Sequence, residues 1–373
     1  MNKAVIAGRI RTVRRQMSKK RIGCLIITKP ANVTYVTGFQ GDDSWAVIAA
    51  GRVYLLTDSR YTEQAEKECP SCRIIDRAGP MAEAVARLAK RVESVRTVTV
   101  EESTSLGDFK RLKESVKARL RTASHIIETA RSTKDASEIA VIRRAASIST
   151  EALEQTLSHI KPGVTESELA GMLDFQIRKL GARNSFETIV AFGPNASRPH
   201  HQPGARKLKK KDTVLIDFGA RYKGYCSDIT RCFAIGGMTA LYKKVYDVVE
   251  QAQAAAIKAV KAGVKITQVD AVARQVIAES DLPVYGHGTG HGFGIEIHES
   301  PFLKADAKGT LEAGQVITIE PGVYMPGKLG VRIEDDILVT DSGRKILTPN
   351  CPHSPFLPIA VRDTKGKNKQ YVT

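Results

Sequence analysis

Hydrophobic residues recur in the first part of the chain with alternating strand and helix periods. The apolar runs that predict β-strands occupy residues 22–27, 46–50, 53–57 and 97–100. The helical periods occupy residues 3–20, 61–69 and 81–92. Gly51-Arg52 is expected to join two of the strands as a hairpin. These patterns predict a small α/β domain at residues 1–130, in which we find no phosphate loop, metal spacing or nucleophile motif.

The pattern changes near residues 130–134, where a long amphipathic helix is expected to begin. Asp135 is suited to cap its N-terminus, and the helical period continues to about His159. The apolar positions that share one face are Ile139, Ile142, Ala146 and Leu153. We therefore expect a second domain at residues 131–373.

The second domain contains an internal repeat. Lys161-Pro-Gly-Val164 matches Lys261-Ala-Gly-Val264, 100 residues later. Each copy precedes an amphipathic helix, near residues 166–180 and 267–279. Residues 208–219 also align without a gap on residues 311–322. Two similar halves predict a pseudo-twofold domain with its site on the axis.

Each half places acids on predicted strands. Residues 214–218 contain Asp217, and a turn at 222–225 leads to a returning strand at 226–234 that contains Asp228. A hairpin here brings the two acids side by side. In the second half, residues 316–320 and 330–338 present Glu320 and Glu334 in the same way. Clustered buried carboxylates repel unless they bind protons or a cation. Four converging acids with one imidazole suit two divalent ions, which can hold a bridging hydroxide and polarise a carbonyl.

A glycine–histidine stretch supplies the imidazoles. Residues 285–299 hold five glycines and three of the eight histidines, His287, His291 and His298. Glycine permits a left-handed backbone and close approach to a ligand. The alternative is a glycine-rich loop with solvated histidines. Pro199-His200-His201 occupies the equivalent place in the first half to Ile297-His298-Glu299.

Composition narrows the class of protein. Contents of 42% hydrophobic and 26% charged residues are ordinary for a soluble globular chain. No apolar run approaches the roughly 20 residues that a membrane span needs. The six cysteines are too sparse for a disulfide scaffold and fit a reducing cytoplasm. Residues 3–20 are expected to form a helix of the domain rather than a transit peptide, because a strand follows almost at once.

The net charge of +17 raises the question of nucleic-acid binding. Basic runs such as residues 11–21 and 206–211 lack interleaved aromatic residues, and no recognition motif accompanies them. Solvated surfaces therefore explain the charge better than a specific nucleic-acid site.

Five motifs in order resemble those of the pita-bread metallopeptidases. They are Val214-Leu-Ile-Asp217-Phe-Gly, Ser227-Asp228-Ile-Thr-Arg, Gly288-Thr-Gly-His291-Gly-Phe-Gly, Ile319-Glu320-Pro-Gly and Val331-Arg-Ile-Glu334-Asp. Within that group the chain is most similar to Xaa-Pro dipeptidases (prolidases) and Xaa-Pro aminopeptidases. Residues 31–39 and 55–61 look like the creatinase/prolidase N-terminal domain. The resemblance implies an α/β (α+β) fold, with that small domain followed by a pseudo-twofold pita-bread catalytic domain.

The resemblance also implies the site residues. The implied metal ligands are Asp217, Asp228, His291, Glu320 and Glu334. Asp228 and Glu334 would bridge two ions, Asp217 would complete one shell, and His291 with Glu320 would complete the other. The implied catalytic residues are His200 and His298, which match substrate histidines, and Glu320 as a proton shuttle. The register of Pro199-His200 favours His200 over His201.

Two further residues are expected to bind substrate. His287 matches a position that is often histidine in prolidase-like members. Arg332 lies two residues before Glu334 and shares its face if both lie on one strand. Arg332 is expected either to hold a substrate carboxylate or to pair with Glu334.

The activity implied by the resemblance is hydrolysis of Xaa-Pro peptide bonds by a metal-bridging hydroxide, as an aminopeptidase or a dipeptidase. The substrates would be small peptides with proline in second position. Oxygen-rich ligands with one imidazole suit Mn²⁺, which the family favours, or Co²⁺, Zn²⁺ or Fe²⁺. A cytoplasmic homodimer is expected. The alternatives are a creatinase-like amidinohydrolase and a basic nucleic-acid- or protein-binding module, and the intact ligand set favours the peptidase.

Overall fold

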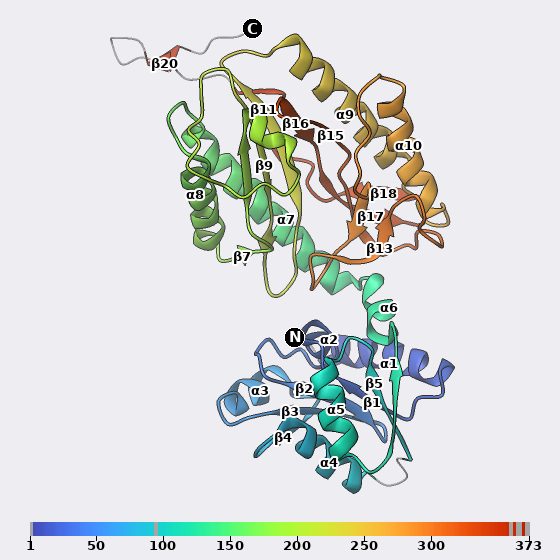
Figure 1. Cartoon of the computed structure of the whole chain (residues 1–373). Coiled ribbons are helices and arrows are strands. Elements are labelled where there is room, and N and C mark those ends of the chain that lie inside the picture. The colour runs from blue at the N-terminus through green and yellow to red at the C-terminus, as the bar shows by residue number, and fades with distance from the viewer. Residues whose placement is uncertain (1–2, 93–95, 358–360, 363–367, 370–373) are drawn as a thin grey trace. The chain divides into compact units, whose positions relative to one another are not determined.

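The computed structural model describes residues 3–92, 96–357, 361–362 and 368–369 (Figure 1). The chain divides into two compact units, Met1–Arg131 and Ser132–Thr373. Among the described residues, no helix combines the length and the apolar character needed to cross a membrane.

The N-terminal unit is built on a mixed six-stranded sheet with the order β4-β3-β2-β1-β5-β6. The strands are β1 (Cys24–Ile27), β2 (Trp45–Ala49), β3 (Arg52–Thr57), β4 (Arg73–Asp76), β5 (Thr97–Glu101) and β6 (Arg119–Ala123). The helices are α1 (Lys3–Lys19), α2 (Pro30–Thr37), α3 (Thr62–Glu68), α4 (Met81–Arg91), α5 (Leu106–Ser115) and α6 (Ile126–Ser132). Buried residues of α4 and α5 pack on one sheet face, against alternate residues of β1 such as Cys24 and Ile26.

The predicted helices and strands of this unit are present, but the predicted hairpin turn is displaced by one residue. Ala49 pairs with Arg52, so the turn residues are Ala50 and Gly51, with φ of +44° and +72°. Two positive φ values in succession match the twist of a tight hairpin. Strand β6 was not predicted because it is largely exposed and lacks an apolar alternation.

The second unit consists of two similar halves. The first contains α7 (Ala136–Thr156), η1 (Leu157–His159), α8 (Glu166–Lys179), β7 (Arg183–Asn184), β8 (Ile189–Phe192), η2 (Gly193–Ser197), β9 (Thr213–Phe218), β10 (Ala220–Arg221) and β11 (Ile229–Ile235). The second contains α9 (Ala240–Ala259), α10 (Ile266–Ala278), β12 (Gly290–Gly292), β13 (Glu299–Leu303), β14 (Val316–Ile319), β15 (Gly322–Met325), β16 (Leu329–Arg332), β17 (Asp335–Thr340) and β18 (Gly343–Ile346). The described C-terminal strands are β19 (Phe356–Leu357), β20 (Val361–Arg362) and β21 (Asn368–Lys369).

Backbone hydrogen bonds repeat across the halves. Gly163 N–H donates to the Leu208 carbonyl at 2.9 Å, and Gly263 N–H donates to the Leu311 carbonyl at 2.8 Å. Strands β8-β9-β11 are adjacent and antiparallel in one sheet, as β12-β14-β17 are in the other. In Figure 1 the strands of this unit run between the helix pair α7–α8 and the pair α9–α10. The pseudo-twofold prediction is confirmed.

Local signals explain where α7 begins. The Asp135 side chain accepts hydrogen bonds from the Ser137 and Glu138 backbone N–H groups. The Asp135 backbone N–H in turn donates to the Glu138 carboxylate. This capping box is the structure that an acid three residues before a glutamate favours. The predicted apolar face is buried at Ile142, Ala146 and Leu153.

One strand prediction is wrong. Residues 330–338 form two strands, β16 and β17, with Ile333 and Glu334 between them. At this break Glu334 makes an isolated bridge with Thr230 of β11, and the Glu334 N–H donates to the Thr230 carbonyl at 3.1 Å. The break therefore joins the two halves of the unit at an acid of the predicted site.

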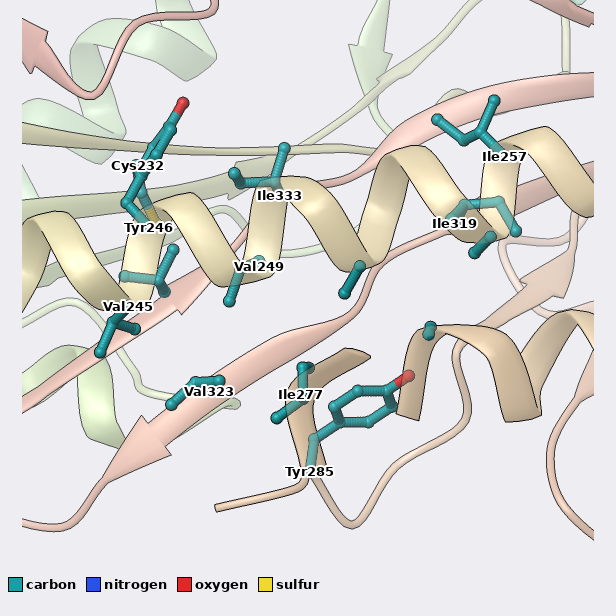
Figure 2. Packing of buried hydrophobic residues seen from close by; sticks show 14 of the residues in the cluster. Cys232, Val245, Tyr246, Val249, Ile257, Ile277, Tyr285, Ile319, Val323 and Ile333 are labelled. Carbon is teal, nitrogen blue, oxygen red and sulfur yellow. The ribbon is translucent and has the colours of Figure 1, made fainter. Parts of the chain in front are cut away.

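The core fixes the direction of the acids. Ile319 and Ile333 are fully buried in a cluster with α9 side chains, among them Val245, Val249 and Ile257 (Figure 2). Successive residues of extended chain point to opposite faces. Packing of Ile319 and Ile333 against the helix layer therefore turns Glu320 and Glu334 to the other side.

Candidate metal centre

All nine predicted site residues line one cavity of about 560 Å³ in the second unit. They are His200, Asp217, Asp228, His287, His291, His298, Glu320, Arg332 and Glu334. Apolar side chains, including Phe186, Ile189 and Phe302, line the same cavity. A concave cavity with convergent polar groups is the usual form of a small-molecule site.

The first pair of acids comes from the β9–β11 hairpin. Asp217 in β9 pairs with Thr230 in β11, and Asp228 lies two residues before Thr230. A spacing of two residues keeps Asp228 on the face of Asp217. The turn at Tyr222–Tyr225 closes with reciprocal backbone hydrogen bonds of 2.8 and 3.0 Å. The predicted hairpin is present, with Thr230 rather than Asp228 directly opposite Asp217.

Three of the predicted ligands form a tight, buried cluster. Single ligand atoms of Asp228, His291 and Glu334 lie within 4.8 Å of one another. His291 Nε2 lies 3.6 Å from Asp228 Oδ2 and 3.5 Å from Glu320 Oε1. The Nδ1 of His291 lies 3.1 Å from the Gly292 carbonyl. A carbonyl only accepts, so Nδ1 carries the proton and Nε2 keeps its lone pair for a ligand.

Electrostatics favour a cation at this cluster. Burial, followed by repulsion between neighbouring carboxylates, raises the pKa of Asp228 and of Glu334 well above the usual range. Burial also raises the pKa of Glu320 to about 7 and lowers the pKa of His291 to about 4. Each shift disfavours the charged form, and a bound cation reverses that preference for the acids.

The donor set fits divalent metal ions. Asp217 Oδ1 is buried and has no hydrogen-bond partner among the described residues. An unpartnered buried carboxylate oxygen is costly unless something coordinates it. The predicted ligands are four carboxylates and one imidazole, and no cysteine is among the described residues that line the cavity. This donor set matches the preferences of hard to borderline divalent ions.

Arg332 is buried and holds Asp217. Its Nη2 lies 2.6 Å from Asp217 Oδ2, and its Nη1 donates to the Tyr324 hydroxyl at 2.8 Å. Glu334 instead accepts from the Thr230 hydroxyl at 2.7 Å. The alternative in which Arg332 pairs with Glu334 is therefore wrong, because its acidic partner is Asp217. The physical reason is the strand break, which removes Glu334 from the strand of Arg332.

The histidines divide by direction. His200 and His298 are exposed on the cavity, and the His298 ring centroid lies 4.4 Å from that of His291. Partial burial of its ring lowers the pKa of His298, and deeper burial lowers the pKa of His287 to about 4. His201 points elsewhere, because its Nε2 lies 2.9 Å from Glu166 Oε2 and its side chain is buried. The preference for His200 over His201 as the cavity residue agrees with this arrangement.

Two residues that contact the site were not predicted. The Tyr324 hydroxyl lies 3.0 Å from His287 Nε2 and also accepts from Arg332. Thr230 donates to Glu334 and accepts from Arg332 Nε at 3.1 Å. The sequence signal that could have found them is alternation along an extended chain, which puts residues at even separations on one face. Thr230 lies two residues after Asp228, and Tyr324 lies four residues after Glu320.

Strand packing, rather than a left-handed backbone, accounts for Gly290 and Gly292 among the five glycines of residues 285–299. None of the five has a positive φ in this fully described segment. A Cβ added at Gly290 would lie 2.0 Å from the Thr318 carbonyl oxygen, and one at Gly292 would lie 2.4 Å from that of Ser300. Close approach of neighbouring strands therefore requires these glycines, and the closeness places His291 beside the acids.

Comparison with known families agrees with these observations. The model of metallopeptidase family M24 matches residues 140–341. The model of the creatinase/prolidase N-terminal domain matches residues 9–133.

Individual relatives cover almost the whole chain. An uncharacterized peptidase of Bacillus subtilis, YqhT, is 38% identical over 334 residues, which are 89% of this chain and 94% of the relative. A solved Xaa-Pro dipeptidase from Bacillus anthracis superposes with a TM-score of 0.91 at 36% identity, covering 94% of this chain and 100% of that one. An X-Pro aminopeptidase from Thermotoga maritima has a TM-score of 0.85 at 34% identity, covering 92% and 99%. The chain therefore belongs to metallopeptidase family M24 and carries a creatinase/prolidase N-terminal domain before its pita-bread peptidase domain.

Proposed function

We propose that this peptidase hydrolyses Xaa-Pro bonds at the N-terminus of small peptides and uses two divalent ions, Mn²⁺ first among them. The observation that carries the proposal is the convergence of four acids and His291 on the cavity that His200 and His298 also line. The names of the solved relatives, an Xaa-Pro dipeptidase and an X-Pro aminopeptidase, support the choice of substrate.

We assign the ligand roles that the family resemblance implies, and the geometry supports them. Asp228 and Glu334, the most enclosed acids of the cavity, repel one another and would be shared by the two ions. Asp217, with its unpartnered Oδ1, would help to hold one ion. His291 Nε2 and Glu320, which lie 3.5 Å apart, would help to hold the other. When bound, such ions polarise a carbonyl and supply a nucleophile at neutral pH.

The protein's own groups complete the reaction. His200 and His298 stand on the open side of the cavity, where they can bind the scissile carbonyl and stabilise the developing oxyanion. Glu320, besides being a ligand, is assigned to deliver a proton to the departing proline nitrogen. His287 and Arg332 are assigned to substrate binding, with Tyr324 linking them.

A substrate series tests this proposal. Metal-loaded protein should hydrolyse Ala-Pro and leave Ala-Ala and N-acetyl-Ala-Pro largely intact. The kcat/KM values for Ala-Pro and Ala-Pro-Ala then distinguish a dipeptidase from an aminopeptidase. Hydrolysis of creatine in place of Xaa-Pro peptides would overturn the proposal in favour of an amidinohydrolase. Fewer than one bound divalent ion per chain after reconstitution would favour a binding module.

The assembly and location of the protein remain predictions. A homodimer is expected, and molar mass measured by light scattering during size-exclusion chromatography checks it. A monomer under assay conditions would contradict that expectation. The expected cytoplasmic location is checked by fractionating cells that express the protein.

A further inference from the structure

Glu166, the first residue of α8, is fully buried outside the metal cluster. Its Oε1 accepts hydrogen bonds from the Phe192 N–H and the Asn195 side-chain amide, both at 2.8 Å. Its Oε2 accepts from the Gly204 N–H at 3.1 Å and lies 2.9 Å from His201 Nε2. All four partners belong to residues 192–204. A buried carboxylate is stable only when its acceptor sites are filled in this way.

Residues 192–204 are the segment that presents His200 to the cavity. The segment also packs on β16, where a Cβ added at Gly330 would lie 1.8 Å from the Ala196 carbonyl oxygen. The Gly327 N–H donates to the Ser197 hydroxyl at 3.3 Å. Contacts with β16 therefore hold the early part of the segment, and Glu166 also holds the part that follows His200.

His200 and His201 are consecutive, and their side chains have different surroundings. The His200 side chain lines the cavity, whereas the His201 side chain is buried and faces Glu166. A fixed His201 ring limits rotation of the backbone between the two residues, and so limits where the His200 imidazole can lie. Placement of a substrate-binding group within about 1 Å can decide a 100-fold change in rate.

The second half of the repeat contains a similar arrangement. Asp270 of α10 is buried and accepts from the Thr289 N–H at 3.3 Å and from the Thr289 hydroxyl at 2.7 Å. The Thr289 carbonyl in turn accepts from the N–H of Glu320 at 2.8 Å. In both halves, a buried acid on the helix after the Lys-x-Gly-Val loop accepts hydrogen bonds from the segment that carries a cavity histidine.

We propose that Glu166 and His201 form a positioning pair that fixes His200 for contact with the substrate carbonyl. The proposal rests on the proposed function, because it takes the role of His200 from there. Neither residue of the pair lines the cavity, so both act through His200.

Glu166→Gln tests the pair, because the amide replaces one acceptor oxygen by a donor. We expect kcat/KM on Ala-Pro to fall about 10- to 100-fold, the range typical of groups that orient a functional residue. Metal content should match that of the wild type, since His200 is not assigned as a ligand. In the metal-free protein, amide hydrogen exchange should accelerate over residues 192–204 and stay unchanged over residues 285–289. Glu168→Gln, an exposed position on the same helix turn, is the matched control and should change neither readout.

A double-mutant cycle separates positioning from a general structural role. In a His200→Ala background, Glu166→Gln should lower kcat/KM by less than about twofold, because coupled residues are not additive. Full additivity would overturn the proposal, as would unchanged exchange over residues 192–204.

Conservative replacement of His201 gives a second route if Glu166→Gln does not fold. Glutamine can place its Nε2 near the position of the imidazole Nε2 and donate to Glu166. His201→Gln should therefore keep most of the activity, and His201→Ala should reproduce the loss expected for Glu166→Gln. Equal activity of the two His201 variants would contradict the proposal. Absence of Xaa-Pro hydrolysis by the wild type would refute only the proposed function, because the exchange experiment still tests the pair.

Discussion

At the scale of single residues, the site depends on charge held where water is scarce. Asp228 and Glu334 are almost inaccessible to solvent. Burial, and then repulsion from neighbouring carboxylates, raises the pKa of both residues. Ile319 and Ile333, which directly precede Glu320 and Glu334, point in the opposite direction, inside the apolar cluster. Glu320 and Glu334 therefore cannot turn away to solvent without exposing isoleucine, which costs about 1.5–3 kcal/mol for each side chain.

Glu320 gives a pH-dependent prediction for the metal-free protein. Burial raises its pKa from 4.5 to about 7, so between these pH values the folded state binds more protons than the unfolded chain. The free energy of unfolding must then fall as pH rises through this window. Glu320→Gln removes this effect, whereas the contributions of His287 and His291 stay in both proteins.

The Tm of metal-free Glu320→Gln relative to wild type should therefore increase as pH rises from 5 to 8. A change of a few degrees is expected, since 1 kcal/mol shifts Tm by roughly 2–4 °C in a domain of this size. Thermal denaturation in a chelating buffer at several pH values checks this. A Tm difference that is constant with pH would show that Glu320 ionises normally.

Asp228→Ala removes a predicted bridging ligand. We expect hydrolysis of Ala-Pro to be abolished and the number of bound ions to fall, while the metal-free fold survives because a repelled acid has been removed. Activity, elemental analysis and circular dichroism are the measurements. Asp247→Ala, which changes an exposed acid paired with Lys243, is the control and should retain full activity. Undiminished turnover of Asp228→Ala in saturating metal would exclude Asp228 as a ligand.

At the scale of elements, part of the site could be predicted from strand alternation and part could not. The β9–β11 hairpin follows from a local pattern of apolar residues around a turn, so the placement of Asp217 and Asp228 was accessible. The break between β16 and β17 was not, because the repeat predicts residues 330–338 as one returning strand, like that of the first half. The break is stabilised by Thr230, which lies about a hundred residues away in the chain.

The glycines of the β12 region also show this limit. Composition alone indicated glycines near a ligand, whereas the structure ties Gly290 to the backbone of β14. The distance between two strands depends on tertiary packing, so the periodicity of one segment does not predict it. The helix α9 was likewise not predicted, although it is the counterpart of α7 in the repeat.

Gly290→Ala tests the packing requirement. The added Cβ would lie 2.0 Å from the Thr318 carbonyl oxygen, so β12 and β14 must move apart and carry His291 away from the acids. We expect a loss of about 1–3 kcal/mol in stability and weaker metal binding. Gly286→Ala is the matched control, since its Cβ would meet nothing within 4 Å. Denaturant unfolding and metal titration check both variants, and equal behaviour of the two would contradict the packing argument.

At the scale of the whole molecule, the site belongs to neither half of the repeat alone. The first half supplies Asp217 and Asp228, and the second supplies His291, Glu320 and Glu334. The Thr230–Glu334 bridge joins them in the backbone, and the Arg332–Asp217 ion pair joins them through side chains. The repeat was readable from the sequence because its loops share residues, and the register of Pro199-His200 favoured His200, but the contact of His201 with Glu166 was not predicted.

The central claim is that these five residues hold two ions that the hydrolysis of Xaa-Pro bonds requires. The most direct test is a titration of metal-free protein with Mn²⁺ in which the rate of Ala-Pro hydrolysis is followed. We expect no turnover without metal and a rate that reaches its plateau at two equivalents of Mn²⁺ per chain. Turnover that persists in excess chelator, or a plateau at one equivalent, would contradict it.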